Sequence, residues 1–225
     1  RIGEVVISDD ASTDGSYERL VQRFQGTKVK VFRNSQNLDC YANKAEAVWR
    51  SQFDWVILFD SDNIIGKGYL DVLYALPKWE EGVIYCPDFA MPHFPYFLWS
   101  GVTIDRHNVS SFMGQPVLRE VMTRKGKVKR MVLDPAGSRF RCLLNTANYF
   151  VPRALYLKVW DDTVDPHTAD SIYFAYLWLK SGGKLRVVPG LRYIHRIHPL
   201  SHYRLNCHKT GEFLSQVEQK LMNLR

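Results

Sequence analysis

The first 90 residues alternate between short apolar runs and segments whose apolar residues recur at helical spacing. The runs at 4–8, 28–32, 54–59 and 82–86 are rich in β-branched or aromatic residues and predict strands. Between them, the segments that start near Asp14, Tyr41 and Tyr69 have the spacing of amphipathic helices. This alternation favours an α/β fold with a mostly parallel sheet. The run at 54–59 is almost continuously apolar, as expected of a strand buried on both faces.

The rest of the chain is less regular. We interpret Met91–Gly137, which is rich in proline, aromatic and basic residues, as loops and short elements that cover one end of the sheet. Regular structure is then predicted as a strand at 148–151, a helix at 169–180, a strand near 185–188 and a terminal helix at 212–224. With 225 residues and no repeat or linker, residues 1–225 are expected to form a single domain.

Charge and cysteine usage limit the classes of protein. The net charge is +7, but the sequence contains no basic cluster interleaved with aromatic residues, so we predict no nucleic-acid binding. It leaves open a diphosphate ligand or a peripheral association with an anionic membrane surface. The four cysteines form no Cys-x-x-Cys pair, which favours free thiols in a reducing compartment. No apolar run is long enough to span a bilayer, so we expect a cytoplasmic protein or one at the cytoplasmic face of a membrane.

Asp60-Ser61-Asp62 places two carboxylates directly after a predicted strand. Open α/β sheets bind ligands at the carboxyl ends of their strands. Carboxylate oxygens of this kind suit Mg²⁺ or Mn²⁺ that carries phosphate oxygens. The alternative is that the two acids only form a turn and cap the next helix.

Asp9 and Asp10 follow the first predicted strand in the same way. The simpler interpretation is local, with Asp14 or Thr13 capping the helix that follows. Capping leaves two adjacent carboxylates unexplained, because like charges in an apolar setting need donors or a cation to compensate them. The base and ribose of a nucleoside offer such donors.

The strings Val5–Ser16 and Ile57–Asp62 together resemble the acidic strand-end motif and the Asp-x-Asp motif of family 2 glycosyltransferases of the GT-A fold. The resemblance implies a Rossmann-like, mostly parallel sheet flanked by helices. It also implies a nucleotide-binding half at 1–88 and an acceptor-binding and catalytic half at 89–225. In such a site the expected nucleotide-sugar contacts are Asp9, Asp10, Asn43, Lys44, Asp60 and Ser61.

The resemblance extends to two later segments. Inverting members of the family carry a carboxylate base at the start of a late helix, and Asp170 has that place here; the alternative is that Asp170 only stabilises the helix N-terminus. The segment 193–201 is similar to the family's closing motif, which implies a diphosphate contact for Arg196 and a metal ligand at His198 beside Asp60 and Asp62. The family's first strand and helix would precede Glu4, and the chain as printed lacks them.

The implied function is metal-dependent, inverting transfer of a sugar from a nucleotide diphosphate donor, with a UDP-sugar as first choice. The acceptor would be a hydroxyl of a glycan, a glycolipid or a protein, and the oligomeric state stays open. Two alternatives compete with it: a haloacid-dehalogenase-like phosphatase with Asp60 as nucleophile, and a non-catalytic carbohydrate-binding module. The phosphatase leaves Asp9 and Asp10 unexplained, and the intact acidic clusters weigh against the binding module.

Overall fold

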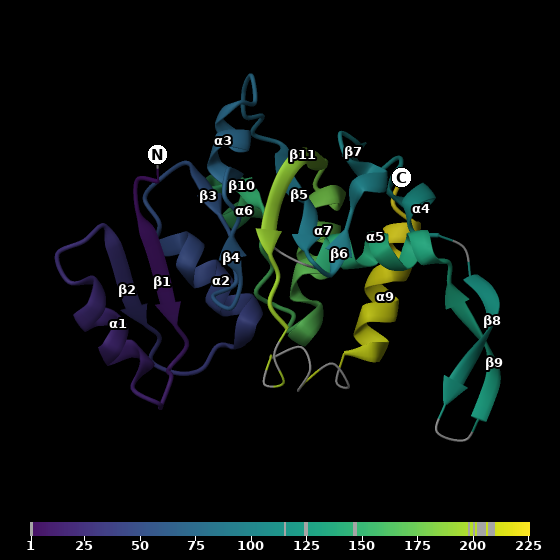
Figure 1. Ribbon diagram of the computed structural model, residues 1–225, viewed down its shortest axis with the longest axis horizontal. Helices are drawn as coiled ribbons and strands as arrows, with labels where there is room; N and C mark the ends of the chain where they lie inside the picture. The colour runs from purple at the N-terminus through teal and green to yellow at the C-terminus, as the bar shows by residue number, and fades with distance from the viewer. Residues whose placement is uncertain are drawn as a thin grey trace.

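The computed structural model describes residues 2–114, 116–123, 126–145, 148–197, 199, 201, 206 and 210–225 (Figure 1). Its strands are β1 (Val5–Asp9), β2 (Val29–Arg33), β3 (Trp55–Ile57), β4 (Ile64–Ile65), β5 (Val83–Met91), β6 (Phe94–Pro95), β7 (Thr103–Ile104), β8 (Pro116–Thr123), β9 (Gly126–Leu133), β10 (Phe150–Pro152) and β11 (Lys184–Ile194). Its helices are α1 (Ser16–Phe24), α2 (Asp39–Arg50), α3 (Tyr69–Tyr74), α4 (Val109–Phe112), α5 (Pro135–Asn145), α6 (Arg153–Val159), α7 (Asp170–Lys180) and α9 (Gly211–Met222), with 3₁₀ turns at Phe97–Trp99 and His167–Ala169.

The central sheet is built around β5 and β11, which pair in parallel along most of their length. The strand order is β3-β10-β5-β11-β4, and the short strands β6 and β7 pair with β5 and β11. The antiparallel neighbours are brief, with two or three paired residues at most. The α/β prediction is therefore confirmed, and the predicted strands at 82–86 and 185–188 both run several residues further.

Each face of the sheet carries its own hydrophobic core. Along β5, Val83 and Tyr85 pack with the core that includes α3, while Ile84 and Cys86 pack with the core that includes α7. Alternate residues of a strand point to opposite faces, so β5 is the strand buried on both sides. The prediction of full burial for 54–59 is wrong over Trp55–Ile57, which is half-buried, because β10 is its only strand partner among the described residues.

The strands β1 and β2 form a separate parallel pair (Figure 1). Helix α2 packs against β1, and helix α1 packs against β2. Within the described residues no strand pairs with the second edge of β1 or of β3. A complete sheet built from these residues alone would have contradicted the expectation of a further strand and helix before Glu4. That expectation stays a prediction.

The segment Met91–Gly137 differs from its prediction. The short elements β6, β7 and α4 are present, but β8 and β9 form an antiparallel hairpin of eight residues a strand, which projects from the body in Figure 1. Apolar and basic residues alternate only over Lys127-Val128-Lys129, so no period of two runs along either strand. The local pattern was too weak to indicate the hairpin.

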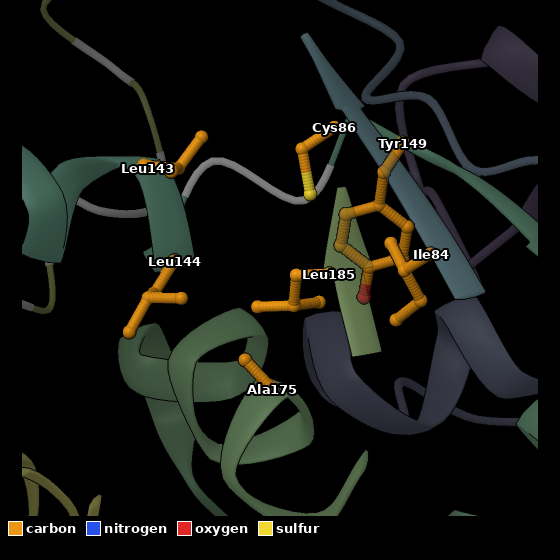
Figure 2. Close-up of a pocket in the computed structure, with 7 residues that line it drawn as sticks. All are labelled: Ile84, Cys86, Leu143, Leu144, Tyr149, Ala175 and Leu185. Atoms are coloured by element: carbon orange, nitrogen blue, oxygen red, sulfur yellow. The ribbon is translucent and has the colours of Figure 1, made fainter. Parts of the chain in front are cut away.

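A small void of about 10 Å³ lies between the sheet and helices α5 and α7. Figure 2 shows its apolar lining, which includes Leu144, Ala175, Leu185 and the Cys86 thiol. This void is too small for a ligand and lies inside the core. The thiols of Cys40, Cys86 and Cys142 are free, as predicted. Within the described residues, no helix combines the length and apolar character needed to cross a membrane.

Candidate functional site

Asp9, at the end of β1, is compensated by donors of its own chain. Its side chain is buried, and its Oδ2 accepts a hydrogen bond from the backbone N of Ser12 at 3.1 Å. The guanidinium of Arg33, at the end of the neighbouring strand β2, lies 3.6 Å from the same oxygen. The loop after β1 is thus folded back on Asp9. A nucleoside is not required to explain the burial of this carboxylate.

Asp10 joins the loop after β1 to the start of α2. Its Oδ1 accepts hydrogen bonds from the backbone N of Leu38 at 2.8 Å and from Nδ2 of Asn34 at 2.9 Å. The same Asn34 amide donates to Oδ1 of Asn43 at 3.0 Å, and Asn43 donates to the carbonyl of Ser8 at 3.2 Å. The structure therefore brings Asp10 and Asn43 together through Asn34, next to Asp9, and the nucleotide contacts expected of these residues stay a prediction. Asn34 is a connecting residue that the sequence motifs did not indicate.

A second cluster gathers where β3, α2 and α7 meet. The ammonium of Lys44, in α2, lies 3.1 Å from Oδ1 of Asp60 and 2.7 Å from Oδ2 of Asp170. Burial alone would lower the pKa of Lys44, but Asp170 and Asp60 outweigh burial and hold that pKa well above its ordinary value. Residues 16, 110 and 126 positions apart in sequence therefore form one continuous ion pair network.

Asn148 fixes Asp60 in this network. Its Oδ1 accepts from the backbone N of Asp60 at 2.9 Å, and its Nδ2 donates to Oδ2 of Asp60 at 3.0 Å. Only 1% of Asn148 is exposed. It precedes β10, and Leu58 donates its backbone N–H to Tyr149 across the pair β3 and β10, which places Asn148 opposite Asp60. Sequence reasoning missed this residue because the contact depends on which strands pair.

The end of β11 reaches the Asp-x-Asp segment. The backbone N of Arg196 donates to Oδ1 of Asn63 at 3.0 Å, and its Nε donates to the carbonyl of Asp62. Ser61 between the two acids is exposed. The structure thus brings Arg196 to Asp62, as the site prediction requires. His198 lies outside the described residues, so its predicted place beside the acids stays a prediction.

His195 is a second imidazole near the acids. Burial lowers its pKa, while Asp62 and Asp60 act in the opposite direction and His93 adds to the lowering. Its ring packs edge-on against Phe94 at 5.2 Å between centroids, and its buried Nδ1 has no hydrogen-bond partner within the described part of the chain. The sequence analysis preferred His198 to this residue.

The residues present fit a divalent cation of the Mg²⁺ or Mn²⁺ kind. Such ions are typically held by one or two carboxylates while phosphate oxygens and water complete the shell, and Asp60 and Asp62 supply carboxylates at the sheet edge. The unpartnered Nδ1 of His195 is a further buried donor atom near both acids. A different trio, Asp39, Asp165 and His167, also has ligand atoms within 4.8 Å of one another, but His167 Nδ1 already pairs with Asp165 at 3.0 Å.

Comparison with known proteins agrees with this geometry. Residues 3–142 match the family model described as Glycosyl transferase family 2. A curated relative, the cholesterol galactosyltransferase of Borreliella burgdorferi, is 27% identical over 116 residues, which is 51% of this chain and 30% of that protein. The chain therefore spans less than a third of the length of this relative.

Solved structures show the same fold at low sequence identity. S. aureus TarS 1–349 in complex with UDP-GlcNAc matches with a TM-score of 0.63 and 15% identity, over 98% of this chain and 58% of that one. The mannosyltransferase PcManGT from Pyrobaculum calidifontis, in complex with GDP-Man and Mn²⁺, matches with a TM-score of 0.57 and 14% identity, over 92% and 51%. The predicted GT-A fold is therefore confirmed, and the chain spans roughly half of these structures.

Proposed function

Since the chain belongs to glycosyl transferase family 2, we propose that it transfers a sugar from a nucleotide diphosphate donor to an acceptor hydroxyl, with inversion at the anomeric carbon. The observation that carries the proposal is the network Asp60, Lys44 and Asp170 at the carboxyl edge of the sheet. In this network Lys44 contacts both Asp60, whose carboxylate suits a metal ion, and Asp170, whose carboxylate is suited to accept a proton. An active site for transfer needs both groups around one reacting carbon.

The donor would lie along the carboxyl ends of β1 and β3. Asp9, Asp10 and Asn43 face the base and ribose in this proposal, and Asp60, Ser61, Lys44 and Arg196 face the ribose and diphosphate. Two structural neighbours are described as complexes with UDP-GlcNAc and GDP-Man, which supports a nucleotide sugar and leaves the base open. A UDP-sugar is our first choice.

A divalent cation would be held by Asp60 and Asp62, with a histidine at 195 or 198 as a further ligand. When bound, such an ion neutralises charge that develops on the departing nucleoside diphosphate. PcManGT is described with Mn²⁺, which supports an ion of this class. The guanidinium of Arg196, already held at Asp62 by its Nε, can turn its remaining N–H donors toward a phosphate.

Asp170 would serve as the general base. The acceptor hydroxyl transfers its proton to the Asp170 carboxylate, its oxygen forms a bond to the anomeric carbon, and the bond from that carbon to the diphosphate breaks with its electron pair. Attack from the face opposite the leaving group inverts the anomeric centre. Asp170 is buried at the first turn of α7. Its negative charge is stabilised by the contact with Lys44 and by its place at the helix N-terminus.

The acceptor half, residues 89–225 in our division, supplies α7 and the exposed side chains of Phe97 and Leu98, which with Pro95 and Arg139 line an open hollow of about 300 Å³. In this proposal the hollow receives the acceptor, a hydroxyl of a glycan, a glycolipid or a protein. The curated relative is named for a sterol acceptor, and the net charge of +7 supports contact with an anionic membrane surface. The phosphatase alternative is not retained, because the chain belongs to a glycosyltransferase family.

Calorimetric titration of UDP, GDP and dTDP, with and without Mn²⁺, tests this proposal. One nucleotide should bind in a metal-dependent manner, and Asp62→Asn should abolish that dependence. Asp54→Asn is the matched control, because Asp54 is exposed just before β3, at the opposite end of that strand. Binding of none of the nucleotides by the wild-type protein would refute the donor site.

A further inference from the structure

Both oxygens of Asp60 are occupied by groups of this chain. Lys44 Nζ lies 3.1 Å from Oδ1, and Asn148 Nδ2 donates to Oδ2 at 3.0 Å. A cation that binds Asp60 must therefore share an oxygen with one of these donors. We propose that Lys44 is a built-in competitor of the divalent cation for Asp60 Oδ1, and that metal binding transfers Lys44 entirely to Asp170. This inference rests on the proposed donor site.

Asn148 determines which oxygen is contested. It grips Asp60 twice, through the backbone N and through Oδ2, and it is buried, so the carboxylate cannot turn freely. Breaking the contact to Oδ2 would leave the buried Nδ2 of Asn148, among the described residues, with the longer hydrogen bond to the Tyr193 hydroxyl at 3.4 Å. The side chain of Asp60 is 32% exposed, and Oδ1 is the oxygen without that constraint. An incoming cation is thus directed to the oxygen that Lys44 contacts.

Two cations on one carboxylate oxygen repel each other strongly. A divalent ion binds oxygen at about 2.1 to 2.5 Å, so it would sit close to an ammonium that lies 3.1 Å from the same atom. Coulomb repulsion at such separations is large where water is scarce. Lys44 cannot keep its 3.1 Å contact with Oδ1 beside a cation bound to the same oxygen, and its other carboxylate partner is Asp170. The lysine must move.

Asp170 is the position to which Lys44 can retreat. The contact to Asp170 Oδ2 is already the shorter one, 2.7 Å, and the side chain of Asp170 is only 10% exposed. Arrival of the metal would then leave a fully formed pair between Lys44 and Asp170. Occupation of the donor site would thereby orient the proposed base.

The test measures the affinity of the protein for Mn²⁺ alone. The electron paramagnetic resonance signal of free Mn²⁺ reports how much of the ion is bound. Lys44→Met should bind Mn²⁺ at least ~10-fold more tightly than the wild type, because the competing charge is gone. Lys44→Gln, which keeps a hydrogen-bond donor for Asp170, should do the same and serves if the methionine variant does not fold. Lys44→Arg keeps the charge and should stay within ~3-fold of the wild type. Lys158→Met is the matched control, since Lys158 is exposed on α6.

An unchanged or weaker Mn²⁺ affinity in folded Lys44→Met and Lys44→Gln would overturn the competition, and so would tighter binding by Lys44→Arg. Turnover of nucleotide sugars is measured separately and reports on the proposed function. Tighter Mn²⁺ binding without any turnover would retain the competition and reject the function. Turnover by the wild type, with no gain in Mn²⁺ affinity in the Lys44→Met and Lys44→Gln variants, would retain the function and reject the competition.

Discussion

The two acidic clusters at the sheet edge differ in how their charge is compensated. Asp9 and Asp10 accept hydrogen bonds from backbone and side-chain groups in the loops after β1 and β2, and Arg33 adds a cation at the rim. Asp60 and Asp170 share a single ammonium, that of Lys44. A charge held by many fixed donors belongs to the architecture. A charge pair bridged by one flexible lysine, with the Asn148 amide as a further donor to Asp60, can exchange that lysine for a ligand.

The comparison predicts that substitutions in the two clusters fail in different ways. Changes around Asp10 should act mainly on stability, and changes around Asp60 and Asp170 mainly on binding and turnover. The largest expected effect concerns the proposed base.

Asp170→Asn should lower kcat by about 10² to 10⁴-fold, the usual contribution of a general base. The donor KM should change little, since the base acts on the acceptor. Turnover of the nucleotide sugar identified by calorimetry provides the measurement. Asp162→Asn is the control, because Asp162 is exposed in the loop before α7. An Asp170→Asn enzyme with nearly full kcat would remove Asp170 from the chemistry and leave it a residue of the helix N-terminus.

Asn148→Ala should weaken metal-dependent nucleotide binding by roughly 10 to 100-fold, the usual effect of losing a group that orients a metal ligand. Asp60 would keep its carboxylate but lose the two contacts that aim it. Titration of Mn²⁺ with the nucleotide measures the loss, and Asn223→Ala, an exposed change after α9, is the control. If affinity is preserved while only the unfolding free energy falls, Asn148 serves packing and not the site.

The same contrast explains what the sequence could reveal. The acidic motifs, the start of α7 and the strands and helices through 86 other than β4 depend on local periodicity and on residues close in sequence, so they were predictable. Contacts such as Asn148 with Asp60 depend on β10 lying beside β3, far along the chain, and no local signal carries that pairing. Lys44 was predicted as a nucleotide contact, but its place between two carboxylates required the packing of α2 against α7.

The extents of the central strands failed for a related reason. β5 and β11 run to Met91 and Ile194 because each supplies the other with backbone partners, although their later residues include proline, charge and glycine. Pairing between strands outweighed the unfavourable local composition. The hairpin of β8 and β9 was missed because its sequence shows no sustained alternation, and its basic residues favoured an interpretation as loops.

Asp10→Ala should lower the free energy of unfolding by about 1 to 3 kcal/mol, because Leu38 N and Asn34 Nδ2 lose their shared acceptor. Urea unfolding measures it. Asp10→Asn keeps an oxygen in place and should lose less. Equal stability of Asp10→Ala and the wild type would show that the first cluster, like the second, waits for a ligand, and the contrast between them would fail.

A carboxylate far from the sheet edge gives the smallest effect and a reference for both clusters. Glu218 in α9 pairs with Arg141 at 2.8 Å, and burial raises the pKa of Glu218 more than Arg141 lowers it. A group whose pKa is higher in the folded state stabilises the fold below its unfolded pKa, near 4.5, and that contribution is lost as pH rises through the folded value.

Glu218→Gln removes this titration, so its unfolding free energy relative to the wild type should rise by up to ~1 kcal/mol between about pH 4 and about pH 7. Urea unfolding at both pH values measures it, and Glu212→Gln, exposed on the same helix, should show no such trend. A relative stability that instead falls toward neutral pH would mean that one nearby cation fully compensates a partly buried carboxylate. Lys44 alone would then suffice to neutralise Asp60, and the difference between the two clusters would lie in number of donors and not in strength.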